Sequence, residues 1–245
     1  MCSRHCAVGP QTTEHSTDRY DLGPANCRPR LQGLWQNDHS DTCIEMPRAK
    51  SHTREDLVSK SMRQFWRHGY QSTSIDDLVR VTGVNRHGIY SDMGGKGGLF
   101  VACLDAYVQS VVTPAFARVE KPGATLDEVA QFFEYQIGLG ESAGLPGIGC
   151  LMANTMTEVA PHNAAIFSLV DQHNTRLRRG FSGAIRNTAR ASSRTLNPKQ
   201  REDLALVLVV FANGLWSMSR TVSDAVVLRK AVNETLELVR ARIDR

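Results

Sequence analysis

The sequence predicts an all-α protein, and three observations support this prediction. Apolar residues recur at spacings of three and four from residue 54 to the C-terminus, no segment shows the alternation of a β-strand, and glycines or prolines fall where the helical stripes stop. Hydrophobic residues make up 41% and charged residues 22% of the 245 residues, which excludes disorder throughout.

The longest apolar run, Leu204–Ala212, is shorter than the roughly 18 residues of a membrane span. Since no apolar signal-peptide core follows Arg4 either, we expect a cytoplasmic protein.

Residues 1–45 differ from the rest of the chain. They contain few apolar residues, show no sustained period and are interrupted by prolines and glycines, so we expect them to be disordered. Four of the six cysteines lie here, but fifteen residues separate Cys27 from Cys43, whereas structural zinc prefers close ligand pairs. We therefore predict no metal site and no cofactor. Another interpretation is that translation starts at Met46, and the intact mass of the native protein would distinguish the two.

In the next segment, residues 46–100, the sequence predicts one amphipathic helix followed by two short helices. It is the basic part of the chain, with nine Lys and Arg against five Asp and Glu. The first helix, residues 54–68, has one apolar face made of Leu57, Val58, Met62, Phe65 and Trp66. Ser74 begins the second helix with an acid three residues on, and Gly83 ends it. Asn85 then begins a third helix, so a tight glycine turn joins two short helices, as in a helix-turn-helix that reads the major groove of DNA.

Helical stripes continue through residues 101–245. We expect helices at 97–113, ended near Pro114, and then at 125–139, 148–160 and 162–190. A further helix contains Leu204–Ala212, which is apolar all round and must be covered on every side. The final helix carries a seam of apolar residues suited to helix pairing, namely Ala225, Leu228, Val232, Leu236 and Val239. These last two helices predict a homodimer built on a four-helix bundle.

At this point the residues resemble the DNA-binding domain of TetR-family transcriptional regulators. The resemblance covers residues 53–103 and depends on the ordered set Phe65, Gly69-Tyr70, Thr73-Ser74-Ile75, Gly83-Val84-Asn85, Tyr90, Gly95-Lys96 and Leu99-Phe100. It implies a DNA-binding domain at 46–100, an effector-binding and dimerisation domain at 101–245, and a repressor released from a near-palindromic operator by a small molecule. The chain departs from the family pattern at four positions, which are His87, Gly88, Met93 and Gly97. Glycine inside a helix costs about 0.8–1 kcal/mol relative to alanine, so we expect a loose start to the fourth helix.

The candidate DNA-binding residues lie in the predicted helix-turn-helix of residues 46–100, which we call the reading head, and they follow from its chemistry. Arg86 can pair bidentately with a guanine, and His87 can donate to a base or a phosphate. Tyr90 and Lys96 suit phosphate oxygens, a role that the resemblance also implies for them. The helix starts contribute the remaining candidates, Thr73, Ser74 and Asn85. The alternative is that Arg86 and Lys96 are ordinary surface charges and that Tyr90 belongs to the core.

An effector pocket is implied by the resemblance, and its candidate residues are polar or soft side chains on apolar faces: Phe133, Gln136, Cys150, Met152, Met156, His173 and Trp216. Each has a simpler interpretation as a core residue.

Cys150 stands near a predicted helix start, where the helix dipole lowers a thiol pKa, so one hypothesis is that it senses an electrophile or oxidant. The other is that it is a small buried residue.

An enzyme and a helical scaffold are the two other classes of protein to compare with the sequence. The run Gly94-Gly95-Lys96-Gly97-Gly98 lacks the following Ser or Thr and the preceding strand of a phosphate loop, and no nucleophile elbow or His-Glu-x-x-His pair occurs. We therefore predict that the chain is not an enzyme. A helical scaffold with a degraded reading head is the remaining alternative. Steep salt dependence of DNA binding would distinguish a regulator from a scaffold.

Overall fold

The structure is a computed structural model that describes residues 53–245. The predictions for residues 1–45 and for a start at Met46 lie outside the described residues. All regular elements of residues 53–245 are helices, which confirms the predicted fold class. They are α1 (Arg54–His68), α2 (Ile75–Thr82), α3 (Arg86–Met93), α4 (Lys96–Tyr107), a π-helical turn (Val108–Val112), α5 (Thr113–Glu120), α6 (Leu126–Ala143), α7 (Leu151–Glu158), a 3-10 turn (Ala160–His162), α8 (Ala164–Ala191), α9 (Pro198–Met218) and α10 (Ala225–Asp244).

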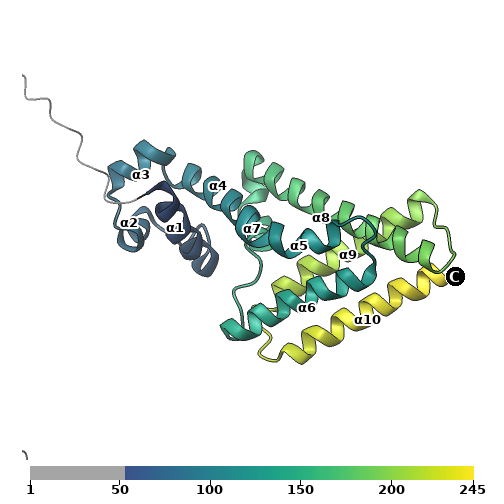
Figure 1. The fold of residues 1–245 in the computed structure, drawn as a ribbon. Coiled ribbons are helices and arrows are strands. Elements are labelled where there is room, and N and C mark those ends of the chain that lie inside the picture. The colour runs from purple at the N-terminus through teal and green to yellow at the C-terminus, as the bar shows by residue number, and fades with distance from the viewer. Residues whose placement is uncertain (1–52) are drawn as a thin grey trace, which may run out of the picture. The chain divides into compact units, whose positions relative to one another are not determined.

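Helices α1 to α3 form a small cluster at one end, and α4 leads from it into a bundle of α5 to α10 (Figure 1). Two hydrophobic cores hold the helices together. The first includes Leu57, Leu78 and Ile89 of the small cluster together with Leu151 and Ile166 of the bundle. The second is aromatic and lies inside the bundle, where it contains Phe116, Phe132, Phe133, Phe181 and Trp216. The small cluster therefore packs directly on the bundle, and the described residues 53–245 belong to one compact unit.

The predicted end of the fourth helix near Pro114 is wrong. The chain stays helical from Lys96 to Glu120, because the backbone widens into a π-helical turn just before the proline. Pro114 then lies in the first turn of α5, the helical position at which proline is best tolerated. By length and composition alone, Lys96–Glu120 is also a stretch that could cross a membrane, with 44% of its most apolar window buried in the protein. Core helices of globular proteins pass the same test.

The apolar seam of the last helix has a different partner from the predicted one. Ala225, Leu228, Val232, Leu236 and Val239 are all buried within this single chain, in the aromatic core of the bundle. The seam is thus used inside the subunit, where α10 lies beside α6 (Figure 1). Helix α9 does keep an uncovered apolar face, since Leu206, Val207 and Val210 are exposed while Ala205 and Leu208 are buried.

Candidate nucleic-acid interface and effector cavities

The helix-turn-helix is set by side chains that cap each helix. The Ser74 hydroxyl accepts from the Asp77 amide at 3.1 Å, and the Asp77 carboxylate accepts from the Ser74 amide at 3.0 Å. The Ser74 hydroxyl also donates to the Asp77 carboxylate at 2.6 Å, and this bond, followed by those from Arg80 and the Ser74 amide, holds the pKa of Asp77 well below its ordinary value. Gly83 ends α2 in the left-handed conformation, and the Asn85 amide oxygen accepts from the Gly88 amide at 2.8 Å. The angle between α2 and α3 is therefore fixed by local hydrogen bonds.

Two glycines at the start of α4, Gly95 and Gly98, have a packing role that the sequence did not reveal. A Cβ on Gly98 would lie 1.8 Å from the Met93 carbonyl oxygen, which is impossible without moving the backbone. Gly95 has φ +97°, and a Cβ there would lie 2.9 Å from the Tyr90 ring. These two glycines let α4 begin directly against α3. The expected loose start of the fourth helix is therefore replaced by a close contact, and of the two glycines inside its first turn only Gly97 could accept a Cβ, which would lie an ordinary 3.8 Å from the Tyr70 hydroxyl.

The predicted DNA-binding residues do not all lie at the surface. Ser74, Asn85, Arg86, His87 and Tyr90 are exposed, and Tyr90 is 52% exposed despite being aromatic. The core interpretation of Tyr90 is therefore wrong. Lys96 is partly buried, with its ammonium 4.2 Å from the centroid of the Tyr70 ring, and burial lowers its pKa. Six of the seven residues thus leave at least part of a side chain accessible on α2, α3 and the start of α4.

Thr73 is the exception, and its predicted role as a phosphate contact needs correction. The residue is fully buried, its hydroxyl donates to the Gly69 carbonyl at 2.7 Å, and its amide donates to Tyr70 at 3.3 Å. Both donors are used within the turn that follows α1. Thr73 therefore stabilises this turn.

Arg86 forms an ion pair with Asp76. Its guanidinium donates to the Asp76 carboxylate at 2.7 Å, and both side chains are well exposed. The contact with Asp76 raises the pKa of Arg86. Solvent screens an exposed ion pair of this kind, so the guanidinium can readily exchange Asp76 for another anion.

The seven predicted effector residues are divided among three cavities and the core. Gln136, Cys150 and Trp216 line a cavity of ≈ 690 Å³ between α1, α6, α9 and the segment 144–150. Met152 and His173 line a cavity of ≈ 300 Å³ between α4 and α8. Met156 lines a third, of ≈ 460 Å³, between α8 and α9. Phe133 is fully buried in the aromatic core and lines none of these three.

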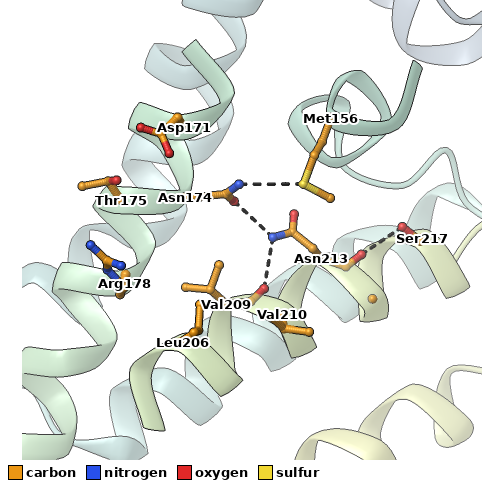
Figure 2. Close-up of a pocket in the computed structure, with 11 residues that line it drawn as sticks. Met156, Asp171, Asn174, Thr175, Arg178, Leu206, Val209, Val210, Asn213 and Ser217 are labelled. Carbon is orange, nitrogen blue, oxygen red and sulfur yellow. Dashed lines mark hydrogen bonds between the residues drawn. The ribbon is translucent and has the colours of Figure 1, made fainter. Parts of the chain in front are cut away.

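The third cavity, of ≈ 460 Å³ between α8 and α9, is lined in part by a network of polar side chains (Figure 2). The side-chain amide of Asn213 on α9 donates to the side-chain Oδ1 of Asn174 at 3.1 Å and to the backbone carbonyl of Val209 at 3.0 Å, while the side-chain amide of Asn174 donates to the Met156 sulfur at 3.8 Å. These bonds join α7, α8 and α9. The cavity rim includes Leu206 and Val210, which belong to the exposed apolar face of α9.

Cys150 stands at the start of α7, as expected, but its chemical environment differs from the expected one. The Tyr107 hydroxyl donates to the Cys150 sulfur at 3.4 Å, and burial raises the pKa of the thiol. The sequence-based expectation of a lowered pKa is wrong, because removal from water outweighs the hydrogen bonds near the helix start. A thiol with a raised pKa is a poor nucleophile at neutral pH.

His173 lies in the apolar stripe of α8 and is buried. Its Nδ1 has no hydrogen-bond partner in the described part of the chain. Burial, with the positive charge of Arg176, lowers the pKa of the imidazole to about 4, so the ring is neutral at pH 7. Arg176 itself is fixed by Glu120 at 2.6 Å and by Thr113 at 2.8 Å.

Two functional contacts were missed by sequence reasoning. The Trp66 indole N–H donates to the Gly149 carbonyl at 2.9 Å, and the Glu158 carboxylate accepts from the amides of Tyr70 at 3.1 Å and Gln71 at 2.8 Å. The first contact joins α1 to the segment before α7, and the second joins the turn after α1 to the end of α7. They connect residues more than 80 positions apart, so no local spacing could have indicated them.

Comparisons with known proteins agree with this geometry. Residues 57–103 match the family described as bacterial regulatory proteins, tetR family. The chain is 31% identical over 130 residues to the HTH-type transcriptional repressor ComR of Escherichia coli (strain K12), a match that covers 52% of this chain and 61% of ComR. It is 22% identical over 125 residues to the uncharacterized HTH-type transcriptional regulator YezE of Bacillus subtilis (strain 168), covering 51% and 64%. The matches thus span about three fifths of these curated relatives.

Solved structures show the same fold. A cysteine mutant of the TetR family transcriptional regulator CifR, complexed with 26-bp double-strand operator DNA, has a TM-score of 0.67 at 18% identity, covering 78% of this chain and 98% of that chain. A TetR transcriptional regulator from Chloroflexus aurantiacus has a TM-score of 0.64 at 22% identity, covering 76% and 93%. Residues 57–103 thus match a family of bacterial regulatory proteins, the tetR family, and the described helices share the fold of solved TetR-type structures.

Proposed function

We propose that this protein is a homodimeric, cytoplasmic transcriptional repressor that binds a near-palindromic operator and is released from it by a small-molecule effector. The observation that carries the proposal is the exposed surface of α3, on which Arg86, His87 and Tyr90 are available to DNA. Arg86 reads a base, and Tyr90 with Lys96 contacts phosphates. Residues 46–100 serve DNA binding and residues 101–245 serve effector binding and dimerisation. Nothing in this role requires catalysis, and we propose that the chain is not an enzyme.

The relatives support the proposal in two ways. ComR is named a transcriptional repressor, and the CifR structure contains double-strand operator DNA. Dimerisation is supported by the exposed apolar face of α9, where Leu206, Val207 and Val210 are each at least half exposed. A second subunit covering this face would place two reading heads on one DNA molecule, with half-sites related by two-fold symmetry.

Selection of bound sequences from random DNA tests the proposal. The full chain and a form starting at Met46 are each used at two salt concentrations. We expect enrichment of a near-palindrome, with affinity falling steeply as salt rises because neutralised phosphates release counterions. No enriched sequence at either concentration would contradict sequence-specific binding. Binding without salt dependence would contradict a DNA-binding role and favour a helical scaffold.

A further inference from the structure

Positive charge is concentrated in the second half of α8 and in the segment that joins α8 to α9. Residues 172–201 contain eight Lys and Arg and neither Asp nor Glu, whereas the whole chain has a net charge of only +4. In the reading head, by contrast, five acids accompany nine basic residues. Protein surfaces usually mix both signs of charge, and a field of one sign attracts partners of the opposite sign. The stretch 172–201 is therefore a candidate binding surface for an anion.

Half of these eight cations have acidic partners among residues 53–245. Each pairs with an acid of α5 or α9, which is Glu120 for Arg176, Glu202 for Arg178 and Arg201, and Asp203 for Lys199. The distances are 2.6 Å for Arg176, 2.7 Å for Lys199, and 3.9 Å and 3.7 Å for the two contacts of Glu202. These four cations serve to join α8 and α9 to their surroundings, and the acids nearest to α8 are used in doing so.

The other four cations, Arg179, Arg186, Arg190 and Arg194, are exposed and form no ion pair with any residue of 53–245. The first three follow one another at spacings of seven and four residues, which places them on one face of α8 over a length of about 16 Å. Arg194 stays beside the end of α8, because its amide donates to the Ala189 carbonyl at 2.8 Å. We call these four residues the arginine stripe.

The arginine stripe lies on the outer side of α8, in the half of the helix that runs away from α1 to α3 (Figure 1). The opposite side of the helix is buried through Leu177, Phe181 and Ala184. The start of α6 fixes this half of α8, since the Leu126 amide donates to the Thr188 hydroxyl at 2.9 Å. The arginines therefore project from a rigid support, at a place separate from the reading head.

The helix dipole accounts for only part of the stripe. Cations stabilise the last turn of a helix, but the effect falls off within that turn. Arg190 is in the last turn of α8, whereas Arg186 and Arg179 lie five and twelve residues before its final residue, Ala191. Neither the dipole nor an ion pair within residues 53–245 explains these two positions.

The composition of this surface favours the backbone of double-stranded DNA as the partner. A guanidinium can donate two parallel hydrogen bonds to one phosphate, and all four residues of the stripe are arginines. Between Phe167 and Leu206 no large hydrophobic side chain is exposed. A membrane-binding helix inserts such side chains among the lipids, and a single-strand site stacks bases on exposed aromatic rings. The stripe offers neither of these features and provides a row of phosphate contacts alone.

We propose that the arginine stripe of α8 binds the phosphate backbone of double-stranded DNA without sequence preference. The site is additional to the reading head, so one molecule can hold two DNA segments, one at each site, and bridge them. The bridging rests on the proposed function, which supplies the first segment. The binding of DNA by the stripe itself does not depend on it.

The test measures the affinity of the full chain for a fluorescent duplex of scrambled sequence, by anisotropy at about 50 mM and about 200 mM salt. The stripe variant carries Arg179→Gln, Arg186→Gln and Arg190→Gln, since glutamine keeps the helix propensity and no ion pair within residues 53–245 is lost. A matched control removes the same charge from three exposed cations that also lack ion pairs within residues 53–245, through the changes Arg220→Gln, Lys230→Gln and Arg242→Gln.

We expect the affinity of the stripe variant at the lower salt to fall about tenfold below that of the control variant. The slope of log affinity against log salt should also decrease by about 3, because three phosphate contacts are lost. Equal affinities and equal slopes in the two variants would overturn the site.

Bridging is measured by the capture of a free labelled duplex on an immobilised one. The natural protein and the control variant should capture the free duplex, and we expect about tenfold less capture by the stripe variant. Equal capture by both variants would overturn the bridging. Vesicles of phosphatidylcholine with about 30% phosphatidylserine test the other partner. Vesicle binding that the stripe variant loses, with duplex binding equal to that of the control, would overturn the DNA site and assign the stripe to an anionic membrane.

Operator selection with the stripe variant separates this inference from the proposed function. The reading head is unchanged in this variant, so we expect it to select the same near-palindrome as the natural protein. If the natural protein selected no operator but still bound the scrambled duplex more tightly than the stripe variant, the regulator would be contradicted and the stripe supported. A clear operator, together with equal duplex binding by the stripe and control variants, would leave the regulator intact and remove this second site.

Discussion

At the scale of single residues, the surface chemistry of α3 could be predicted from the sequence, because capping signals place short helices well. Ser74 and Asn85 begin α2 and α3 as the sequence indicated, and Arg86, His87 and Tyr90 are exposed. Thr73 could not be placed this way. It stands next to a helix start like any candidate phosphate contact, but the turn after α1 uses both of its donors. Whether a polar group is free depends on tertiary partners that a local pattern does not contain.

The Arg86–Asp76 ion pair leads to a prediction about DNA affinity. Arg86→Ala should weaken operator binding by about 1–3 kcal/mol and relax selectivity at one base position, since a bidentate guanine contact is lost. Asp76→Asn should strengthen binding, because it removes a negative charge near the DNA and frees the guanidinium that Asp76 holds at 2.7 Å. Fluorescence anisotropy with the selected operator measures both. An Arg86→Ala variant with full affinity and unchanged selectivity would contradict base readout.

His173 leads to a prediction about pH. Its pKa is lowered to about 4 in the folded protein from an ordinary value near 6.5, so the unfolded chain binds more protons between these two pH values. The free energy of unfolding should therefore fall as the pH drops from 6.5 towards 4, by up to about 3 kcal/mol. Urea titrations at several pH values measure this loss. His173→Phe should lose less stability over the same range, and an equal loss would show that other groups cause it.

At the scale of elements, periodicity predicted the existence of the helices better than their ends. Apolar stripes indicated α1, α6, α8 and α10, because each helix buries one face. The end predicted at Pro114 failed because a π-helical turn accommodates the proline, and such turns leave no clear mark in a single sequence. The seam of α10 was recognised as apolar, but periodicity cannot tell a partner in the same chain from one in another subunit.

The first turn of α4 offers a matched pair of substitutions. Gly98→Ala places a Cβ 1.8 Å from the Met93 carbonyl oxygen, so backbone must move, and we expect a loss of about 1–3 kcal/mol in stability. Gly97→Ala has 3.8 Å to the nearest atom, the Tyr70 hydroxyl, and should gain about 0.8–1 kcal/mol from helix propensity. Thermal unfolding of the two variants measures the difference. If both were stabilised, the close contact between α3 and α4 would be contradicted.

At the scale of the whole molecule, sequence reasoning anticipated a reading head and a helical bundle but not the contacts that join them. Trp66 and Gly149 are 83 residues apart, and Tyr70 and Glu158 are 88 apart. The positions of the predicted effector residues could not be predicted for the same reason, because local sequence patterns do not reveal tertiary contacts. Helical faces indicated which side chains turn inward, but only the tertiary arrangement of the helices brings Gln136, Cys150 and Trp216 to one cavity and leaves Met156 and His173 in others.

The exposed face of α9 carries the last prediction, which concerns assembly. Val210 is 65% exposed on a helix whose neighbours Leu206 and Val207 are also half exposed, and a two-fold contact would bring this face close to its own copy. Val210→Glu would then bury two like charges in an apolar interface, so we expect the dimer to dissociate. Tyr135→Ser, which changes a 47% exposed aromatic residue on α6, is the control and should remain dimeric. Sedimentation velocity at micromolar concentration measures both variants.

Because a monomer contacts one half-site at a time, Val210→Glu should also lose most of its affinity for the full operator while keeping weak, salt-sensitive binding. A dimeric Val210→Glu protein with full operator affinity would show that subunits associate through another surface.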